Sequence, residues 1–303
     1  DHRDLHSFPT RRSSDLVYSC AVGIMIIAIA AIKGGVGKTT VTFCLAATLA
    51  HMGKKVLCID LDHQGDLSSA MGAERDASEP DIGQILYAPK REQADLMAQG
   101  IIDVQGWCHL ITPGMDLGGY QTEIEKGLSS ESRLKDALAQ FNSVYENYDY
   151  VLLDTPKGEG LFTKNALVAC DEVLVPVQTE YFALKNIPEL LNLVSQIADR
   201  ANPDLRVSTL VPNRMKATSL HKSIHQQIID WDVRTHLLHQ SEESWTAPPI
   251  RDLTVYSELS AQGESLYSYG SVKEEHREPF VAIAEHLETL RNQANTREVE
   301  TVG

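Results

Sequence analysis

A glycine-rich segment between two apolar stretches constrains the fold of this 303-residue chain more than any other feature. Residues 33–40 read KGGVGKTT, the preceding residues 26–32 are apolar (IIAIAAI), and residues 41–49 read VTFCLAATL. The first apolar run is typical of a buried strand and the second of a helix. A glycine-rich turn from a strand into a helix is the setting that a phosphate-binding loop requires.

The residue types of this loop suit an anion. Glycines let the backbone fold closely around a phosphate, and successive N–H groups and the helix N-terminus supply partial positive charge. Lys38 can reach the β- and γ-phosphates of a nucleotide, and the Thr39 hydroxyl can ligate Mg²⁺. The segment fits the pattern GxxxxGK[ST] at every fixed position except the first, where Lys33 replaces glycine.

Carboxylates follow two further apolar runs. Residues 55–60 (KVLCID) predict a second buried strand that ends in Asp60, with Asp62 two residues later. Residues 148–156 (YDYVLLDTP) predict another strand, which ends in Asp154. Because the carboxyl ends of parallel strands lie at one edge of a sheet, we expect these acids beside the phosphate loop, where they could hold Mg²⁺ and orient a water. Taken alone, Asp60 and Asp62 would be better interpreted as helix caps or solvated loop residues, and their combination with the phosphate loop favours the functional interpretation.

Strands and helices are expected to alternate along the rest of the chain. Further strands are predicted at residues 109–114 (with a turn), 172–177 and 207–214, with a looser match at 245–251. Helices are predicted at residues 82–87, 91–99, 132–141, 161–169, 221–231 and 272–293, and a long one that opens at 178–184 and reaches about 200. This alternation predicts an α/β fold with one doubly wound, mostly parallel sheet flanked by helices.

Lys33 begins the sequence KGGxGKTT, and with this signature the chain resembles the ParA/MinD family of P-loop ATPases. The resemblance extends over about residues 25–290. Residues 60–66 (DLDHQGD) are similar to the family's DxDPQGN segment, with His63 in place of proline. Residues 178–184 (QTEYFAL) are similar to its PxEYxAL segment. The resemblance is greatest to small ParA-type partition ATPases, and it implies the P-loop NTPase fold.

The resemblance also implies roles for individual residues. Lys33 would reach across a dimer interface to the phosphates bound by the other subunit, and Asp62 would position the hydrolytic water. Asn213 would recognise adenine, with Pro212 beside the base. The implied catalytic residues are Lys33, Lys38 and Asp62, and the implied magnesium-binding residues are Thr39, Asp60 and Asp154. The implied ATP-binding residues are Gly34, Gly35, Val36, Gly37, Lys38, Thr39, Thr40, Pro212 and Asn213.

Lys157 departs from the family pattern. Relatives usually carry two prolines after the acid that corresponds to Asp154, whereas here Pro156 is followed by Lys157. The extra cation could lie near the γ-phosphate or at the dimer face, and our hypothesis is that it modulates hydrolysis. An ordinary surface lysine on a loop is an equally good interpretation, and the sequence leaves both open.

The first 24 residues differ from the rest of the chain. Residues 7–16 (SFPTRRSSDL) match the translation of a common sequencing-adapter oligonucleotide, so residues 1–24 are interpreted as a non-native, disordered extension and Met25 as the natural start. A signal peptide is the competing interpretation, but the apolar run at 17–32 is short for a membrane span and ends in the phosphate loop. We expect a single ParA-like ATPase domain over residues 25–293 and a frayed tail over 294–303.

Charge and cysteine usage narrow the possible functions. The formal net charge of −15 should repel nucleic acid at long range, so DNA binding would require a local or dimer-created basic patch. Five cysteines without a CxxC pair favour reduced, mostly buried thiols in a cytoplasmic protein and argue against an iron–sulfur relative. Seven glutamates between residues 274 and 300 argue against a basic, membrane-binding helix.

The resemblance implies an ATP-dependent switch for plasmid or chromosome partitioning, with ATP and Mg²⁺ as cofactors. ATP would close a homodimer that binds DNA without sequence preference, and a ParB-like partner would stimulate slow ATP hydrolysis. The candidate DNA-binding residues are Arg214, Lys216, Lys222 and Arg251, although four scattered cations also fit a solvated face. The protein would be cytoplasmic, and nucleoid-associated if it binds DNA. The alternatives are a ParA-like ATPase that positions a protein cargo or assists conjugative DNA transfer, and a metabolic ATP-dependent ligase, which would generally lack Lys33.

Overall fold

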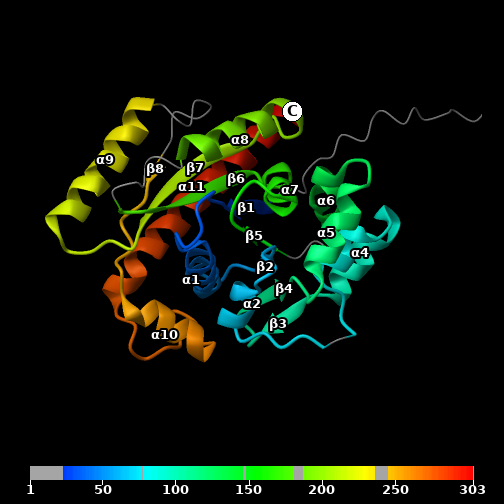
Figure 1. Cartoon of the computed structure of the whole chain (residues 1–303), viewed down its shortest axis with the longest axis horizontal. Helices are drawn as coiled ribbons and strands as arrows, with labels where there is room; N and C mark the ends of the chain where they lie inside the picture. The colour runs from blue at the N-terminus through cyan, green and yellow to red at the C-terminus, as the bar shows by residue number, and fades with distance from the viewer. Residues whose placement is uncertain (1–22, 77, 146–147, 181–186, 236–244, 303) are drawn as a thin grey trace, which may run out of the picture.

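An eight-stranded sheet runs through the centre of the protein (Figure 1). This computed structural model describes residues 23–76, 78–145, 148–180, 187–235 and 245–302. The strands lie in the order β3-β4-β2-β5-β1-β6-β7-β8, and every neighbouring pair is parallel except β3 and β4. The strand bounds are β1 Met25–Ile29, β2 Val56–Asp60, β3 Ile102–Val104, β4 Cys108–Ile111, β5 Tyr150–Asp154, β6 Glu172–Gln178, β7 Arg206–Asn213 and β8 Trp245–Thr246.

The direction of winding reverses at β1. Strands β5 and β2 lie on one side of β1, and β6 and β7 lie on the other. The register pairs Ile29 of β1 with Asp154 of β5, and Asp154 with Asp60 of β2, so these three strands end level with one another. In open parallel sheets, ligands bind at the carboxyl ends of the strands at such a point of reversal. The phosphate loop follows β1 at this point.

Helices cover both faces of the sheet (Figure 1). The helices on one face are α3 Ile82–Tyr87, α4 Lys90–Gln99, α5 Leu117–Glu125, α6 Arg133–Tyr145, α7 Leu161–Ala169, α8 Ile187–Arg200 and α9 Ser219–Thr235. The helices on the other face are α1 Lys38–His51, α2 Asp66–Ala70, α10 Thr254–Gln262 and α11 Glu274–Val302. A sheet that is covered on both faces needs strands that are apolar on both faces, which explains the continuous apolar runs in the sequence.

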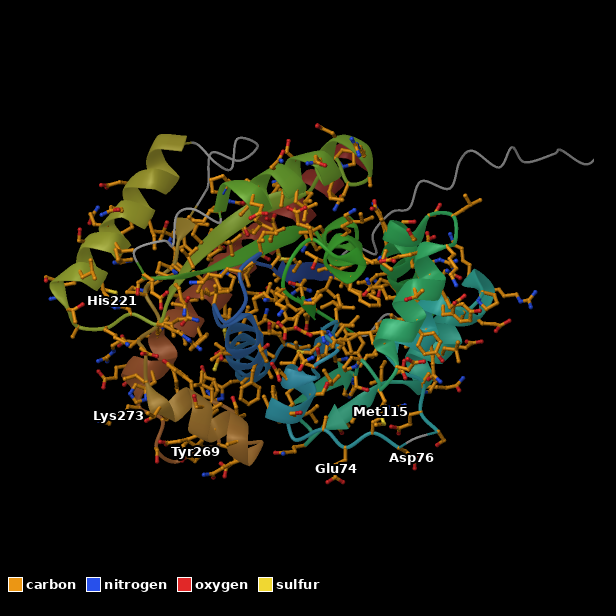
Figure 2. All side chains as sticks on the ribbon, viewed as in Figure 1. Glu74, Asp76, Met115, His221, Tyr269 and Lys273 are labelled. Atoms are coloured by element: carbon orange, nitrogen blue, oxygen red, sulfur yellow. The ribbon has the colours of Figure 1, made fainter. Side chains whose placement is uncertain are left out.

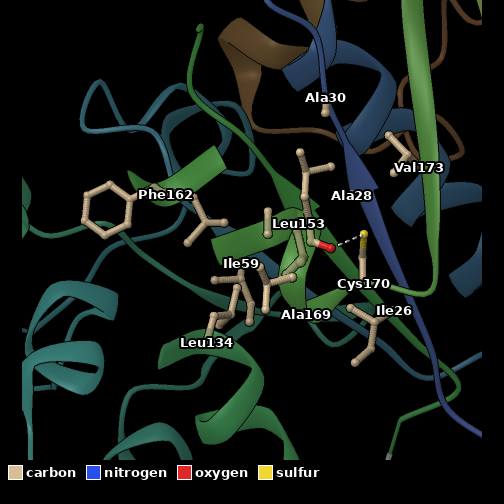
Figure 3. Close-up of a cluster of buried hydrophobic side chains, with 14 of the residues drawn as sticks. Ile26, Ala28, Ala30, Ile59, Leu134, Leu153, Phe162, Ala169, Cys170 and Val173 are labelled. Atoms are coloured by element: carbon tan, nitrogen blue, oxygen red, sulfur yellow. Dashed lines mark hydrogen bonds between the residues drawn. The ribbon is translucent and has the colours of Figure 1, made fainter. Parts of the chain in front are cut away.

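Successive residues of the central strands β1, β2 and β5 contact different cores. In β1, Ile26 and Ala28 belong to the first core, whereas Met25 and Ile27 belong to the second. Figure 3 shows part of the first core, with Ile26, Ala28 and Val173 among its side chains. Burial of an isoleucine side chain contributes about 1.5–3 kcal/mol to stability. The two cores therefore hold β1, and with it the start of the phosphate loop, from both sides of the sheet.

The doubly wound, mostly parallel α/β sheet predicted from the sequence is confirmed. The elements β3, α2, α5 and α10 are absent from the prediction. Strand β3 is a short edge strand in which only Val104 is buried, and Gly118 and Gly119 within α5 disfavour a helix. The last helix extends to Val302 instead of the predicted end at 293, because no glycine or proline interrupts it after Pro279.

Residues 1–22 of the expected extension lie outside the described residues, and a single domain over 25–293 stays a prediction. Among the described residues, no helix has the length and apolar character that crossing a bilayer requires.

A cluster of hydrogen bonds and ion pairs connects α11 to the amino edge of the sheet. Arg291 donates to the Gly23 carbonyl over 2.6 Å and to Asp149 Oδ1 over 2.7 Å. Glu288, one turn earlier, accepts hydrogen bonds from Lys54 and from the Tyr150 hydroxyl. Because these contacts lie at the amino ends of β1 and β5, the opposite edge of the sheet remains available for the loops that follow the strands.

Glu172 is an unusually placed acid at the start of β6. Its side chain is buried, and the Oε2 atom has no hydrogen-bond partner among the described residues. Burial raises the pKa of Glu172 to about 7, although Arg206 and a hydrogen bond with Ser208 oppose this effect. The ionised form of this carboxyl group is therefore unfavourable in the folded protein.

We expect Glu172→Gln to gain stability relative to the wild type as the pH rises. The pKa in the folded state lies above the ordinary 4.5, so the wild-type fold binds more protons and loses stability as pH rises from 4.5 through about 7. This loss amounts to about 3 kcal/mol at most, and glutamine cannot undergo it. Urea unfolding between about pH 5 and pH 8 measures the effect, and a stability difference that does not change with pH would contradict it.

Candidate nucleotide-binding site

The loop between β1 and α1 has the backbone that a phosphate requires. Gly35 and Gly37 adopt left-handed conformations, with φ of 74° and 92°, which glycine tolerates without strain. A Cβ atom on Gly37 would also collide with the Asn213 side chain. No side chain caps the N-terminus of α1, so its backbone N–H groups and partial positive charge are available to an anion.

A cavity of about 850 Å³ lies at the carboxyl edge of the sheet, over this loop. Its volume is within the range of pockets that hold small molecules. Its lining comes from the phosphate loop with the start of α1, the loop after β2 with the start of α2, α5, the loop after β5 with the start of α7, and the residue that follows β7. The lining residues are Gly34, Gly35, Gly37, Lys38, Thr39, Asp62, His63, Gln64, Asp66, Gln121, Pro156, Lys157, Gly160, Leu161, Phe162 and Arg214.

Hydroxyl and carboxylate oxygens gather beside the loop in a set that suits Mg²⁺. Thr39 Oγ1 donates to Asp154 Oδ2 over 2.8 Å, and Thr42 Oγ1 donates to Asp154 Oδ1 over 3.2 Å. On the adjacent strand, Asp60 Oδ2 accepts from the Ser68 amide and hydroxyl over 3.0 and 2.8 Å. Mg²⁺ in nucleotide sites is bound through one or two such protein oxygens together with substrate phosphates. Thr39 and Asp154 could therefore hold the ion, and Asp60 lies beside Asp154 on the adjacent strand.

Burial shapes the titration of these groups. Burial, and then the neighbouring Asp60 charge, raises the pKa of Asp154 to about 8. Burial likewise raises the pKa of Asp60 to about 6, although hydrogen bonds from Ser68 oppose the shift. Burial lowers the pKa of Lys38, whereas the negative charges of Asp154 and Asp62 raise it. A divalent cation would favour the ionised form of both carboxylates, so the site is electrostatically suited to one.

Asp62 lies in the cavity wall, where the sequence predicts the residue that orients water. Its Oδ1 atom accepts from the Gln64 amide over 3.1 Å and lies 3.2 Å from His63 Nδ1. The Asp62 amide in turn donates to Asp60 Oδ1 over 3.1 Å. These bonds hold the loop after β2 in place although His63 stands where relatives carry proline.

Lys33 does not line this cavity. Its Nζ donates to Gln178 Oε1 over 2.9 Å and to Glu180 Oε2 over 3.3 Å, at the end of β6. The Lys33 and Glu180 side chains are 37% and 54% exposed. The lysine is thus held within its own subunit at the surface beside the loop, and a role toward a second subunit stays a prediction.

Asn213 ends β7 and is buried against the phosphate loop. Its Nδ2 donates to the Val36 carbonyl over 2.8 Å, and its Oδ1 accepts from the Arg214 amide over 2.8 Å. The Asn213 amide is therefore engaged within the protein, and contact with adenine stays a prediction, as it does for Pro212. Thr40 is half-buried in the first turn of α1.

The four candidate DNA-binding cations lie in different settings. Arg214 lines the cavity, and Lys216 Nζ pairs with Asp252 Oδ2 over 3.4 Å. Arg251 pairs with Glu275. Lys222 is exposed on α9, next to His221, which Figure 2 labels near the start of that helix. Acids thus neutralise two of the four cations, and nothing in the local sequence indicates these two pairs.

Sequence reasoning also missed several residues of the site. Thr42 and Ser68 hold the two buried carboxylates, and Gln121 and Phe162 line the cavity. The position of Thr42, one helical turn after Lys38, is a signal that could have been used. Gln121 carries no such signal. It belongs to α5, a helix that the sequence does not predict because Gly118 and Gly119 disfavour helix formation.

Comparison with known proteins gives concordant results. A family model described as an AAA domain matches residues 24–207. The sporulation initiation inhibitor protein Soj of Bacillus subtilis is 38% identical over 192 residues, which are 63% of this chain and 73% of the relative. The chromosome partitioning protein ParA of Myxococcus xanthus is 30% identical over 262 residues, which are 86% of this chain and 87% of the relative.

A solved structure of similar fold holds a nucleotide and a metal ion. Cobyrinic acid a,c-diamide synthase from Mycobacterium smegmatis with bound ADP and magnesium is 26% identical, with a TM-score of 0.68. The similarity covers 88% of this chain and 96% of that structure.

Proposed function

Because the chain belongs to the ParA/MinD family of P-loop ATPases, we propose that it is an ATP-dependent dimerising switch for plasmid or chromosome partitioning. At the coarser level the chain is a ParA-like ATPase. One observation carries the proposal. The phosphate loop, which contains Lys33 and Thr39, lies at the same edge of the sheet as Asp60 and Asp154. The cavity at this edge is large enough for a nucleotide.

ATP would occupy this cavity with its phosphates against the loop. Lys38 and the open N-terminus of α1 would bind the phosphate oxygens, and Asp62 would orient the water that attacks the γ-phosphorus. Thr39 and Asp154 would hold Mg²⁺, which would supply positive charge for the phosphates. The synthase structure with bound ADP and magnesium supports a nucleotide and Mg²⁺ as the ligands of this site.

Two such subunits would then close on their nucleotides. Lys33 supports this step because it lies beside the loop without lining its own cavity. In the proposed cycle, the ATP-bound homodimer binds DNA without sequence preference. A ParB-like partner triggers slow hydrolysis, which releases the DNA. The protein would be cytoplasmic and associated with the nucleoid in its ATP state.

ATP-dependent retention on DNA tests the proposal. The Asp62→Ala variant is expected to bind ATP without hydrolysing it, so it should remain on non-specific duplex DNA with ATP and Mg²⁺ and leave it with ADP. Because phosphate contacts release counterions, affinity should fall steeply, by about 10³-fold or more between 50 and 200 mM salt if six phosphates are contacted. Absence of ATP-dependent retention even at low salt would contradict the DNA role.

One observation favours a second candidate, a ParA-like ATPase that positions a protein cargo. The pairs of Lys216 with Asp252 and of Arg251 with Glu275 reduce the charge that this surface could present to DNA. Under this alternative, the protein would dimerise with ATP and bind no DNA. The same retention experiment, combined with sizing of the ATP-bound protein, separates the two candidates.

A further inference from the structure

Lys157 lies in the wall of the nucleotide cavity, in the loop that joins β5 to α7. The next residue, Gly158, has φ of 85°, and its amide donates to the Ile32 carbonyl over 3.1 Å. Since Ile32 directly precedes the phosphate loop, this bond ties the two loops together. The position of Lys157 is therefore set by the end of β1 as well as by β5.

The Lys157 side chain lies across the phosphate loop. A Cβ atom built on Gly34 would stand 3.4 Å from Lys157 Cδ and 3.8 Å from Lys157 Cβ, which are ordinary contact distances. Gly34 and Lys157 both line the cavity. The apolar stem of the lysine thus packs against the loop, and Lys157 lines the same cavity as Lys38.

Lys157 also differs from the other lysines of the site in its surroundings. Lys33 is paired with Glu180, and Lys38 lies among Asp154 and Asp62. No ion pair joins Lys157 to an acid among the described residues. Two ammonium groups in one cavity repel each other unless an anion lies between them. This second observation points to a negatively charged ligand that Lys157 and Lys38 share.

We propose that Lys157 is a second phosphate-binding lysine that acts within its own subunit on the terminal phosphate of a nucleoside triphosphate. The inference rests on the proposed function, because it requires ATP in this cavity. Lys157 follows Asp154 by three residues, and Asp154 with Thr39 would hold Mg²⁺ beside the terminal phosphates of a bound triphosphate. Lys157 thereby favours the triphosphate over the diphosphate before any dimer forms.

Nucleotide titrations of the full chain with Mg²⁺ test the inference, at protein concentrations too low for dimerisation. For Lys157→Gln we expect about tenfold weaker binding of a non-hydrolysable ATP analogue, because one charged hydrogen bond is lost. ADP binding should change by less than about twofold. Lys157→Arg keeps the charge and should restore most of the preference. Lys55→Gln is the matched control, because Lys55 is exposed at the opposite, amino edge of the sheet.

The remaining outcomes are distinguishable. An equal loss of affinity for the analogue and for ADP would overturn the inference, because it would show a general charge effect. Unchanged analogue affinity together with a weaker ATP-bound dimer would also overturn it and would assign Lys157 to the dimer face. If the wild type bound neither nucleotide, the proposed function itself would fail, whereas a wild type that binds both isolates the role of Lys157.

Discussion

Lys38→Ala is expected to lower ATP hydrolysis by at least about a hundredfold, because it removes the lysine of the phosphate loop that would contact the transferred phosphate. Lys38 is only 8% exposed and lies between Asp154 and Asp62 at the cavity. Without it, Asp154 and Asp62 would lose the positive charge with which both of them interact. Nucleotide affinity should fall together with turnover, since the contact exists both before and during the reaction.

Phosphate release and nucleotide titration measure both effects of Lys38→Ala, and circular dichroism confirms that the variant is folded. Lys55→Ala serves as the control, because it removes a lysine from the opposite edge of the sheet and should retain full activity. Retention of more than about a tenth of wild-type hydrolysis by Lys38→Ala would show that the loop is not the catalytic phosphate site.

Lys33→Ala is expected to lose hydrolysis to a similar degree but to keep its nucleotide affinity. Lys33 does not line its own cavity, so its removal should leave a single subunit able to bind ATP. A cation supplied by a neighbouring subunit during phosphoryl transfer is worth about 10³–10⁵ in turnover. Separate measurements of nucleotide binding, hydrolysis and dimerisation with ATP therefore distinguish Lys33 from Lys38.

A mixing experiment makes the prediction for Lys33 sharper. Lys33→Ala and Asp62→Ala should each be inactive alone. In a mixed dimer, the Lys33→Ala subunit keeps its own Asp62 and receives Lys33 from its partner, so one of the two sites is complete. Random pairing of equal amounts should restore about a quarter of wild-type turnover. If the mixture stayed inactive although mixed dimers formed, Lys33 would act within its own subunit.

The sequence predicted the fold and the convergence of the main site residues for one physical reason. Strands such as β1, β2 and β5 are buried on both faces, so they appear as continuous apolar runs. Parallel strands bring the residues at their carboxyl ends to one edge, which places Asp60 and Asp154 side by side next to the loop. Short-range pattern and sheet geometry were sufficient for these residues.

The settings of other site residues depend on contacts between distant segments. The pairs of Lys216 with Asp252 and of Arg251 with Glu275 join residues far apart in sequence, and nothing local distinguishes these lysine and arginine residues from free cations. Likewise, the bond from Asn213 to the Val36 carbonyl spans 177 positions. Such pairings form only when the sheet assembles, so a residue-by-residue analysis could not assign them.

The contact of Lys33 with Glu180 would oppose the proposed reach of this lysine toward a second subunit. To reach a neighbour, the lysine must first leave Glu180 and Gln178. An ion pair as exposed as this one is worth about 0–1 kcal/mol. It therefore favours the position of Lys33 beside Glu180 over a position toward a second subunit by about fivefold at most. In the proposed dimer, this small bias would disfavour movement of Lys33 in an empty subunit, and contact with a bound triphosphate would outweigh it.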